Sequence, residues 1–252
     1  MDYQYIFERV ESKYTITKKQ YDEILRRCSE RITEDIFPHS DISSIYFDSS
    51  TYSMARNSLD HPAYKEKLRL RSYGNVEDDS TVFFEIKKKY NGVIYKRRQG
   101  MTYIAAKRYT LFNKMPCDTQ IMKEIDYLCN SKEELKPICL INYQRDSFTG
   151  VNEADLRITF DYDLCYTLDN LVLTNRKLTP LTNEDLIIME IKTLTAMPLW
   201  LTAILDEMKI YPSNFSKYGT VYRNNLSKGA QLCSTYYSHL YFPIRSALQT
   251  TS

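Results

Sequence analysis

The sequence predicts an α+β protein built on a closed antiparallel β-barrel, with a polar, basic interior and helices packed on the outside. The first observation is a strand-like segment in which cations occupy every second position, namely Lys65, Lys67, Arg69 and Arg71. Side chains of a strand alternate between its two faces, so these cations share one face and Leu68 and Leu70 share the other. A barrel can enclose such charges, and its closure removes exposed sheet edges.

The second observation is that the same alternation recurs in three other segments, as the pairs Glu11 and Lys13, Glu85 and Lys87, and Glu190 and Lys192. Neighbours on one face lie roughly 6.7 Å apart. Two like charges at about 7 Å repel by about 2.4 kcal/mol at an effective dielectric of about 20. Interleaved carboxylates, or a bound polyanion, would offset this repulsion. An exposed edge strand with a solvated face is the competing interpretation, and the recurrence in four segments argues against it.

Hydrophobic periodicity and turn residues predict the remaining elements. We expect strands near 5–15, 43–48, 65–73, 81–88, 93–100, 139–147, 155–162 and 187–194, with a shorter strand near 219–223. Asn91 and Gly92 predict a hairpin turn between two of them. Thr17 is expected to cap a helix over 17–32, a second helix is expected over 120–135, and Pro198 is expected to open a third. The helix around Trp200 would plug the barrel or brace it from outside.

Size and composition are those of one globular domain. We expect this domain to span residues 1–225, followed by a tail over 226–252 that is helical or partly disordered. The six cysteines form no CxxC pair and the N-terminus lacks a secretory signal, so reduced thiols and a cytoplasmic location are expected. The longest apolar run, near Leu199 to Leu205, is too short to span a bilayer.

The composition also narrows the chemistry. The net charge is only +2, so any affinity for anions must come from the placement of the 34 lysines and arginines. The sequence has no basic tail of the kind that binds nucleic acid, so no nucleic-acid partner is expected. The six glycines form neither GxGxxG nor GxxxxGK, and the three histidines lie outside the charged strands. If phosphates are bound, side chains must bind them.

A series of short motifs then identifies a family. In chain order they are RVESKYTIT, IYFDSSTYSMARNSLD, KLRLRSYG, FFEIKKKYNGVIYKRR, NYQRDSF, LRITFD, IMEIK and FSKYGT. Through these motifs the chain resembles, over about residues 5–225, the bacterial stand-alone form of the VTC (vacuolar transporter chaperone) domain. That domain is a polyphosphate polymerase of the CYTH-like triphosphate tunnel metalloenzymes. Its members form an antiparallel β-tunnel and transfer the terminal phosphate of ATP to a growing polyphosphate chain with Mn²⁺ or Mg²⁺.

The resemblance implies roles for individual residues of this chain. Catalytic roles fall on Lys13, Arg69, Arg71 and Glu190. Phosphate contacts fall on Lys13, Arg69, Arg71, Lys87, Lys96, Arg145, Arg157, Lys192 and Lys217, and Lys67 and Arg98 share faces with these residues. Glu190 would hold the divalent metal, and Glu11 and Glu85 would line the same tunnel. Asp161 would hold an arginine in place or assist the metal, whereas Lys88, Lys89 and Arg97 are expected to face solvent or a partner.

One position departs from the wider superfamily, whose first strand carries Glu-x-Glu-x-Lys. Here the stretch reads Arg9-Val10-Glu11-Ser12-Lys13, so arginine replaces the first glutamate. The change removes one candidate metal ligand and adds a cation. It favours binding of a long phosphate chain over a two-metal hydrolase.

Three functions therefore follow from the sequence. The first is an ATP–polyphosphate phosphotransferase that uses ATP with phosphate, pyrophosphate or polyphosphate as acceptor. The second is an inorganic triphosphatase or nucleoside triphosphatase that uses water. The third is a non-catalytic polyphosphate sensor. Some relatives carry this domain fused to membrane segments, so export of the product by this chain would need a separate membrane protein.

Overall fold

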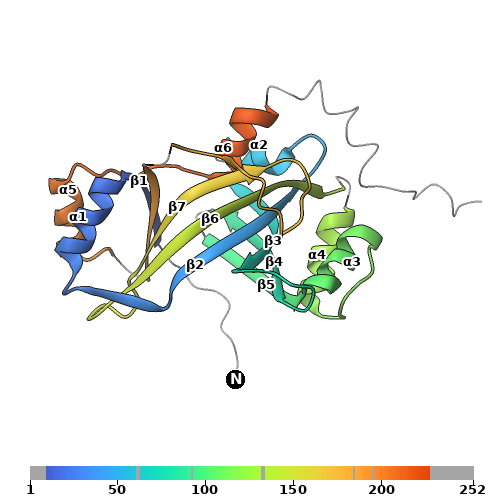
Figure 1. Cartoon of the computed structure of the whole chain (residues 1–252), viewed down its shortest axis with the longest axis horizontal. Helices are drawn as coiled ribbons and strands as arrows, with labels where there is room; N and C mark the ends of the chain where they lie inside the picture. The colour runs from blue at the N-terminus through green and yellow to red at the C-terminus, as the bar shows by residue number, and fades with distance from the viewer. Residues whose placement is uncertain are drawn as a thin grey trace, which may run out of the picture.

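The computed structural model describes residues 10–60, 63–91, 93–131, 134–183, 185–194 and 196–227 (Figure 1). Its strands are β1 (Val10–Thr17), β2 (Ile32–Asp48), β3 (Tyr64–Tyr73), β4 (Thr81–Tyr90), β5 (Val93–Thr102), β6 (Lys136–Gly150), β7 (Arg157–Thr167), β8 (Thr179–Pro180) and β9 (Leu186–Thr193). Its helices are α1 (Lys18–Cys28), α2 (Ser53–Leu59), α3 (Tyr103–Phe112), α4 (Gln120–Asn130), α5 (Leu199–Glu207) and α6 (Lys217–Val221), followed by the π-helical turn η1 (Tyr222–Leu226).

The strands form one open antiparallel sheet, so the prediction of a closed barrel is wrong. Its order is β1-β9-β7-β6-β2-β3-β4-β5, with β8 beside β7. Within the described residues β1 and β5 are edge strands that do not pair with each other. The sheet curls far enough for side chains to bridge the gap, since Lys87 Nζ of β4 lies 3.2 Å from Glu11 Oε2 of β1. The charged residues therefore line a curled inner face rather than an enclosed interior.

The free edge of β1 is covered by the segment 212–216. Tyr14 forms an isolated bridge with Pro212, and the Ser213 N–H donates to the Lys13 carbonyl oxygen at 2.7 Å. Thr15 Oγ1 and Ser213 Oγ share a second hydrogen bond at 3.0 Å. These contacts hold the segment against the end of the inner face.

Helices cover both faces of the sheet (Figure 1). On the outer face, α1 and α5 pack on apolar residues of β1, β7 and β9, while α3 and α4 pack on those of β2, β3 and β4. Trp200 of α5 packs against the first of these clusters, so its helix is an outer brace. By contrast, α2 and α6 lie on the inner face, where Tyr218 stacks on Tyr46 with ring centroids 5.1 Å apart. The expectation that all helices pack outside is thus wrong for this pair.

Several predicted elements are confirmed. Thr17 caps α1 through a capping box with Gln20, and β4 and β5 form the expected hairpin. Strand β2 begins earlier than predicted, because a register shift between Glu34 and His39 accommodates Pro38 inside a long strand. The short strand predicted near 219–223 is wrong, since Ser216 caps a helical turn there by accepting the Gly219 N–H.

Other expectations remain open. The predicted tail falls almost entirely on residues 228–252, outside the described residues, as do Arg9 and the first residues of the strand expected near 5–15. A single domain over 1–225 stays a prediction. Among the described helices, none has the length and apolarity that a membrane crossing requires.

The buried carboxylate of Asp48 ties the two inner helices together. It accepts hydrogen bonds from the Met54 and Ala55 N–H groups at 2.9 Å and from the Tyr218 hydroxyl at 2.7 Å.

Replacement of Tyr218 by Phe removes a hydrogen bond to a charged acceptor, so we expect the free energy of unfolding in urea to fall by about 2 kcal/mol. The exposed control Tyr211→Phe should leave it within about 0.5 kcal/mol. Equal effects would show that Asp48 does not anchor α6.

Candidate phosphate-binding site

Strand pairing places the predicted charges in rows across the inner face. Residues paired across antiparallel strands share a face, which gives the rows Lys67–Lys87–Lys96 and Arg69–Glu85–Arg98 on β3, β4 and β5. On the other half of the sheet, Lys13 pairs with Glu190, and Glu11 with Lys192, which in turn pairs with Arg157. The period of two seen in the sequence thus becomes a continuous lattice of charge.

Glu85 is the centre of the first cluster. Its carboxylate is 1% exposed and accepts Arg69 Nη2 at 2.6 Å, Arg98 Nη2 at 2.5 Å and Lys96 Nζ at 2.9 Å. Burial alone would raise the pKa of Glu85, but Arg69 and the neighbouring cations outweigh burial and hold it well below its usual range. Glu85 is therefore ionised and fixes the guanidinium groups around it.

Two tyrosines extend this cluster into the sheet. Arg71 Nη2 donates to the Tyr143 hydroxyl at 2.9 Å, and Arg69 Nη1 donates to the Tyr46 hydroxyl at 3.3 Å. Because each guanidinium has several fixed partners, little conformational freedom remains for it to lose when an anion binds.

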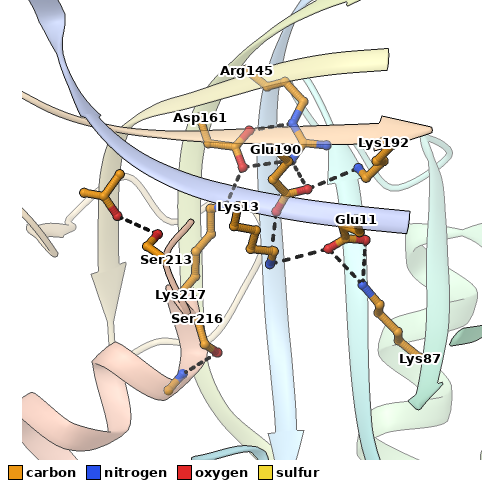
Figure 2. A network of polar contacts seen from close by, with 12 residues as sticks. Glu11, Lys13, Lys87, Arg145, Asp161, Glu190, Lys192, Ser213, Ser216 and Lys217 are labelled. Carbon is orange, nitrogen blue, oxygen red and sulfur yellow. Dashed lines mark hydrogen bonds and ion pairs between the residues drawn. The ribbon is translucent and has the colours of Figure 1, made fainter. Parts of the chain in front are cut away.

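Glu190 is the centre of the second cluster (Figure 2). Its oxygens lie 3.2 Å from Lys13 Nζ, 3.1 Å from Lys192 Nζ and 3.9 Å from Arg145 Nη2. Burial opposes ionisation, yet Lys13 and Lys192 hold the pKa of Glu190 well below its usual range. Burial likewise tends to lower the pKa of Lys13, but Glu190 and Glu11 outweigh it and raise that pKa.

Asp161 positions two further cations beside Glu190 (Figure 2). Its fully buried carboxylate accepts Arg145 Nε at 2.5 Å and Nη2 at 2.8 Å, and it also contacts Lys217 Nζ. The expectation that Asp161 holds an arginine in place is confirmed. Burial would raise its pKa, but Lys217 and Arg145 lower it, so the carboxylate stays ionised.

A cavity of about 320 Å³ adjoins the cluster around Glu190 at the gap between β1 and β5, and Glu11, Lys13 and Lys87 line it. Lys67 reaches into this part of the face, where its Nζ donates to Ser216 Oγ at 3.0 Å. Burial, followed by the charges of Lys13 and Lys87, lowers the pKa of Lys67 to about 7. Lys89 also lines the cavity, so the expectation that it faces solvent or a partner is wrong.

The structure brings most of the predicted site residues together. Two of them differ from the rest, because Arg157 Nη2 instead contacts Asp35 at 2.6 Å, and Lys67 has no carboxylate partner within the described ranges. Sequence reasoning left Lys65, Lys89 and Ser216 out of the site. The two lysines had a signal, since they continue the period of two in β3 and β4. Ser216 lies in the motif FSKYGT beside the predicted Lys217, but only the tertiary fold brings it to Lys67.

The carboxylates fit a divalent cation that is shared with bound phosphate. Across the described residues, no group of three or more His, Cys, Asp or Glu side chains forms a protein-only metal site. Glu11 and Glu190 are nevertheless neighbours, since Lys13 Nζ lies 3.6 Å from the first and 3.2 Å from the second. Mg²⁺ is commonly bound by one or two carboxylates together with substrate phosphate oxygens. This donor set fits that mode.

Comparison with known proteins gives a family match. The model of the VTC domain matches residues 8–224, whereas no curated protein matches the chain. Two solved structures, each titled "putative adenylate cyclase", are similar. The one from Bacillus halodurans is 14% identical, with a TM-score of 0.49, and covers 79% of this chain and 87% of its own. The one from Vibrio parahaemolyticus is 15% identical, with a TM-score of 0.46, and covers 89% and 99%.

The first prediction from this geometry concerns Glu85. Replacement by Gln removes the buried counter-charge that Arg69, Arg98 and Lys96 share, so we expect the free energy of unfolding to fall by about 3 kcal/mol. Added tripolyphosphate should restore more stability to this variant than to the wild type. The control Glu124→Gln alters an outward pair with Arg97 at 3.3 Å and a hydrogen bond from Gln120 at 3.2 Å, and it should cost less than about 1 kcal/mol. A Glu85 variant as stable as this control would contradict the prediction.

The second prediction concerns pH. The pKa of Lys67 is about 7 in the folded protein and about 10.4 in an unfolded chain. Between these values the unfolded state binds more protons at this site, so its contribution to stability rises with pH. Urea unfolding should therefore show wild type gaining stability relative to Lys67→Gln from about pH 7 to about pH 9. A difference that does not change with pH would refute the lowered pKa. The pKa of Lys96 is also lowered, but Lys96 is present in both proteins, so its contribution cancels in the difference between their stabilities.

Proposed function

Because the chain belongs to the VTC-domain family, we propose that it is a metal-dependent polyphosphate polymerase that transfers the terminal phosphate of ATP onto a growing inorganic polyphosphate chain. One observation carries this proposal. Each inner-face carboxylate of the two clusters, Glu11, Glu85, Asp161 and Glu190, is contacted by two or more cations. The face keeps an excess of positive charge after its own carboxylates are matched, as a polyphosphate site requires.

Phosphoryl transfer needs positioning and charge neutralisation more than covalent help from the protein. Arg69, Arg71 and Arg145 are oriented by Glu85, Tyr143 and Asp161, respectively, so the guanidinium N–H groups that these partners leave free can donate to phosphate oxygens. Lys13, Lys87 and Lys192 act as point charges beside them. A divalent cation held by Glu190, with Glu11 near by, would neutralise charge on the nucleotide phosphates.

In this reaction an oxygen of the acceptor attacks the γ-phosphorus of ATP. The bond from that phosphorus to the oxygen bridging the β- and γ-phosphates breaks, ADP leaves with the electron pair, and the chain grows by one phosphate. The arginines hold the donor in line with the acceptor and neutralise the transferred group.

The direct test is to incubate the purified protein with ATP, Mn²⁺ or Mg²⁺, and pyrophosphate as primer, and to separate the products on a gel stained for polyphosphate. The proposal expects a ladder of long chains with a matching amount of ADP. Release of orthophosphate without a ladder would replace it with a triphosphatase. Absence of both products would favour a sensor that binds polyphosphate without turnover.

Glu190→Gln gives the sharper mutational test. We expect turnover to fall at least about a hundredfold, because the amide cannot hold the cation, while tripolyphosphate binding without metal should be retained or tightened as one negative charge is removed. The control Glu207→Gln alters a pair with Arg27 on the outer helices and should behave like wild type. Unchanged turnover in Glu190→Gln would remove the metal role of this residue.

A further inference from the structure

The cavity of about 320 Å³ beside the Glu190 cluster differs from the two clusters, because several of its lysines have no carboxylate partner among the described residues. It lies between β1, β3 and β4, and residues 212–216 close one side. Three of its lysines, Lys65, Lys67 and Lys89, form no ion pair with a carboxylate of the described residues. Lys65 and Lys89 are directly paired across β3 and β4, so their charges reinforce one another.

The carboxylates on the cavity wall do not match these lysines. Glu66 accepts the Tyr64 hydroxyl at 2.7 Å and lies 3.9 Å from Lys88. Glu11 is engaged by Lys13 and Lys87. Lys65, Lys67 and Lys89 therefore lack a carboxylate counter-charge in the described part of the chain. A bound anion would supply that counter-charge and would favour the protonated form of Lys67.

We propose that this cavity binds the acceptor end of the polyphosphate chain, whereas the clusters around Glu85 and Glu190 bind the triphosphate of the nucleotide. This inference rests on the proposed function and adds which part of the inner face holds which substrate. A bound nucleotide would share a divalent cation with protein carboxylates, and such carboxylates lie in the clusters. The acceptor is a polyanion that needs cations alone, which the three lysines supply.

The position and size of the cavity suit this role. Glu11, Lys13 and Lys87 belong both to its wall and to the network around Glu190 (Figure 2). An acceptor end in the cavity therefore adjoins the phosphate to be transferred. The volume of about 320 Å³ equals that of about ten water molecules in the liquid, which accommodates a short run of phosphate units.

A binding titration tests the cavity without turnover. The probe is long-chain sodium polyphosphate, and the variant is the triple replacement Lys65→Gln, Lys67→Gln and Lys89→Gln. We expect it to lose at least about tenfold in polyphosphate affinity, while its affinity for a non-hydrolysable ATP analogue with Mg²⁺ changes by less than about threefold. The control Lys123→Gln lies on the outer helix α4, where it alters only an exposed pair with Asp118, and should match wild type. Unchanged polyphosphate affinity, or an equal loss of nucleotide affinity, would overturn the assignment.

Turnover separates this inference from the proposed function. In the triple variant we expect the KM for the pyrophosphate primer to rise and the chains to shorten, with the KM for ATP unchanged. If the wild type makes a ladder and the triple variant makes an identical one, only the assignment of the acceptor site is overturned. No ladder from wild type overturns the polymerase and the acceptor role together. Thermal unfolding monitors folding, and the single variant Lys67→Gln replaces the triple variant if the latter is unfolded.

Discussion

The inner face depends on buried carboxylates that are each shared by several cations. Glu85 and Glu190 lie in surroundings that disfavour charge, yet the lysines and arginines around them keep both ionised. Each carboxylate lets several cations sit closer together than their mutual repulsion would otherwise permit. Removal of one partner from such a group is costly, because it leaves the remaining buried charges unmatched. The same sharing leaves an excess of positive charge on the inner face.

Much of this site was predictable from the sequence, because strand periodicity is a local property. Alternation in β3, β4 and β9 fixes which residues share a face, and cross-strand pairing then brings Glu85 to Arg69 and Lys13 to Glu190. The cap at Thr17 and the hairpin after Tyr90 also depend on neighbouring residues alone. Features of this kind do not require knowledge of the tertiary fold.

The features that were wrong or missed depend on contacts between distant segments. Whether a curled sheet closes is decided by its two edge strands, and no local pattern in β1 or β5 reports their separation. The turn around Gly219 is helical because α6 packs against α2 and Tyr218 reaches Asp48, a residue 170 positions away. Lys89 has the right alternation, but only the position of residues 212–216 makes its surroundings a cavity.

The gap between β1 and β5 changes how a polymer can reach the face. In a closed ring a long chain must be threaded by one end, and its middle has no way in. Here β1 and β4 meet across the opening through side chains, such as Glu11 with Lys87. The backbone contacts that hold residues 212–216 run to β1, so among the described residues no ladder between β1 and β5 would have to break for the opening to widen. A polyanion could then enter the inner face from the side, along its length. A polyanion chain whose two ends are held elsewhere could therefore still bind there.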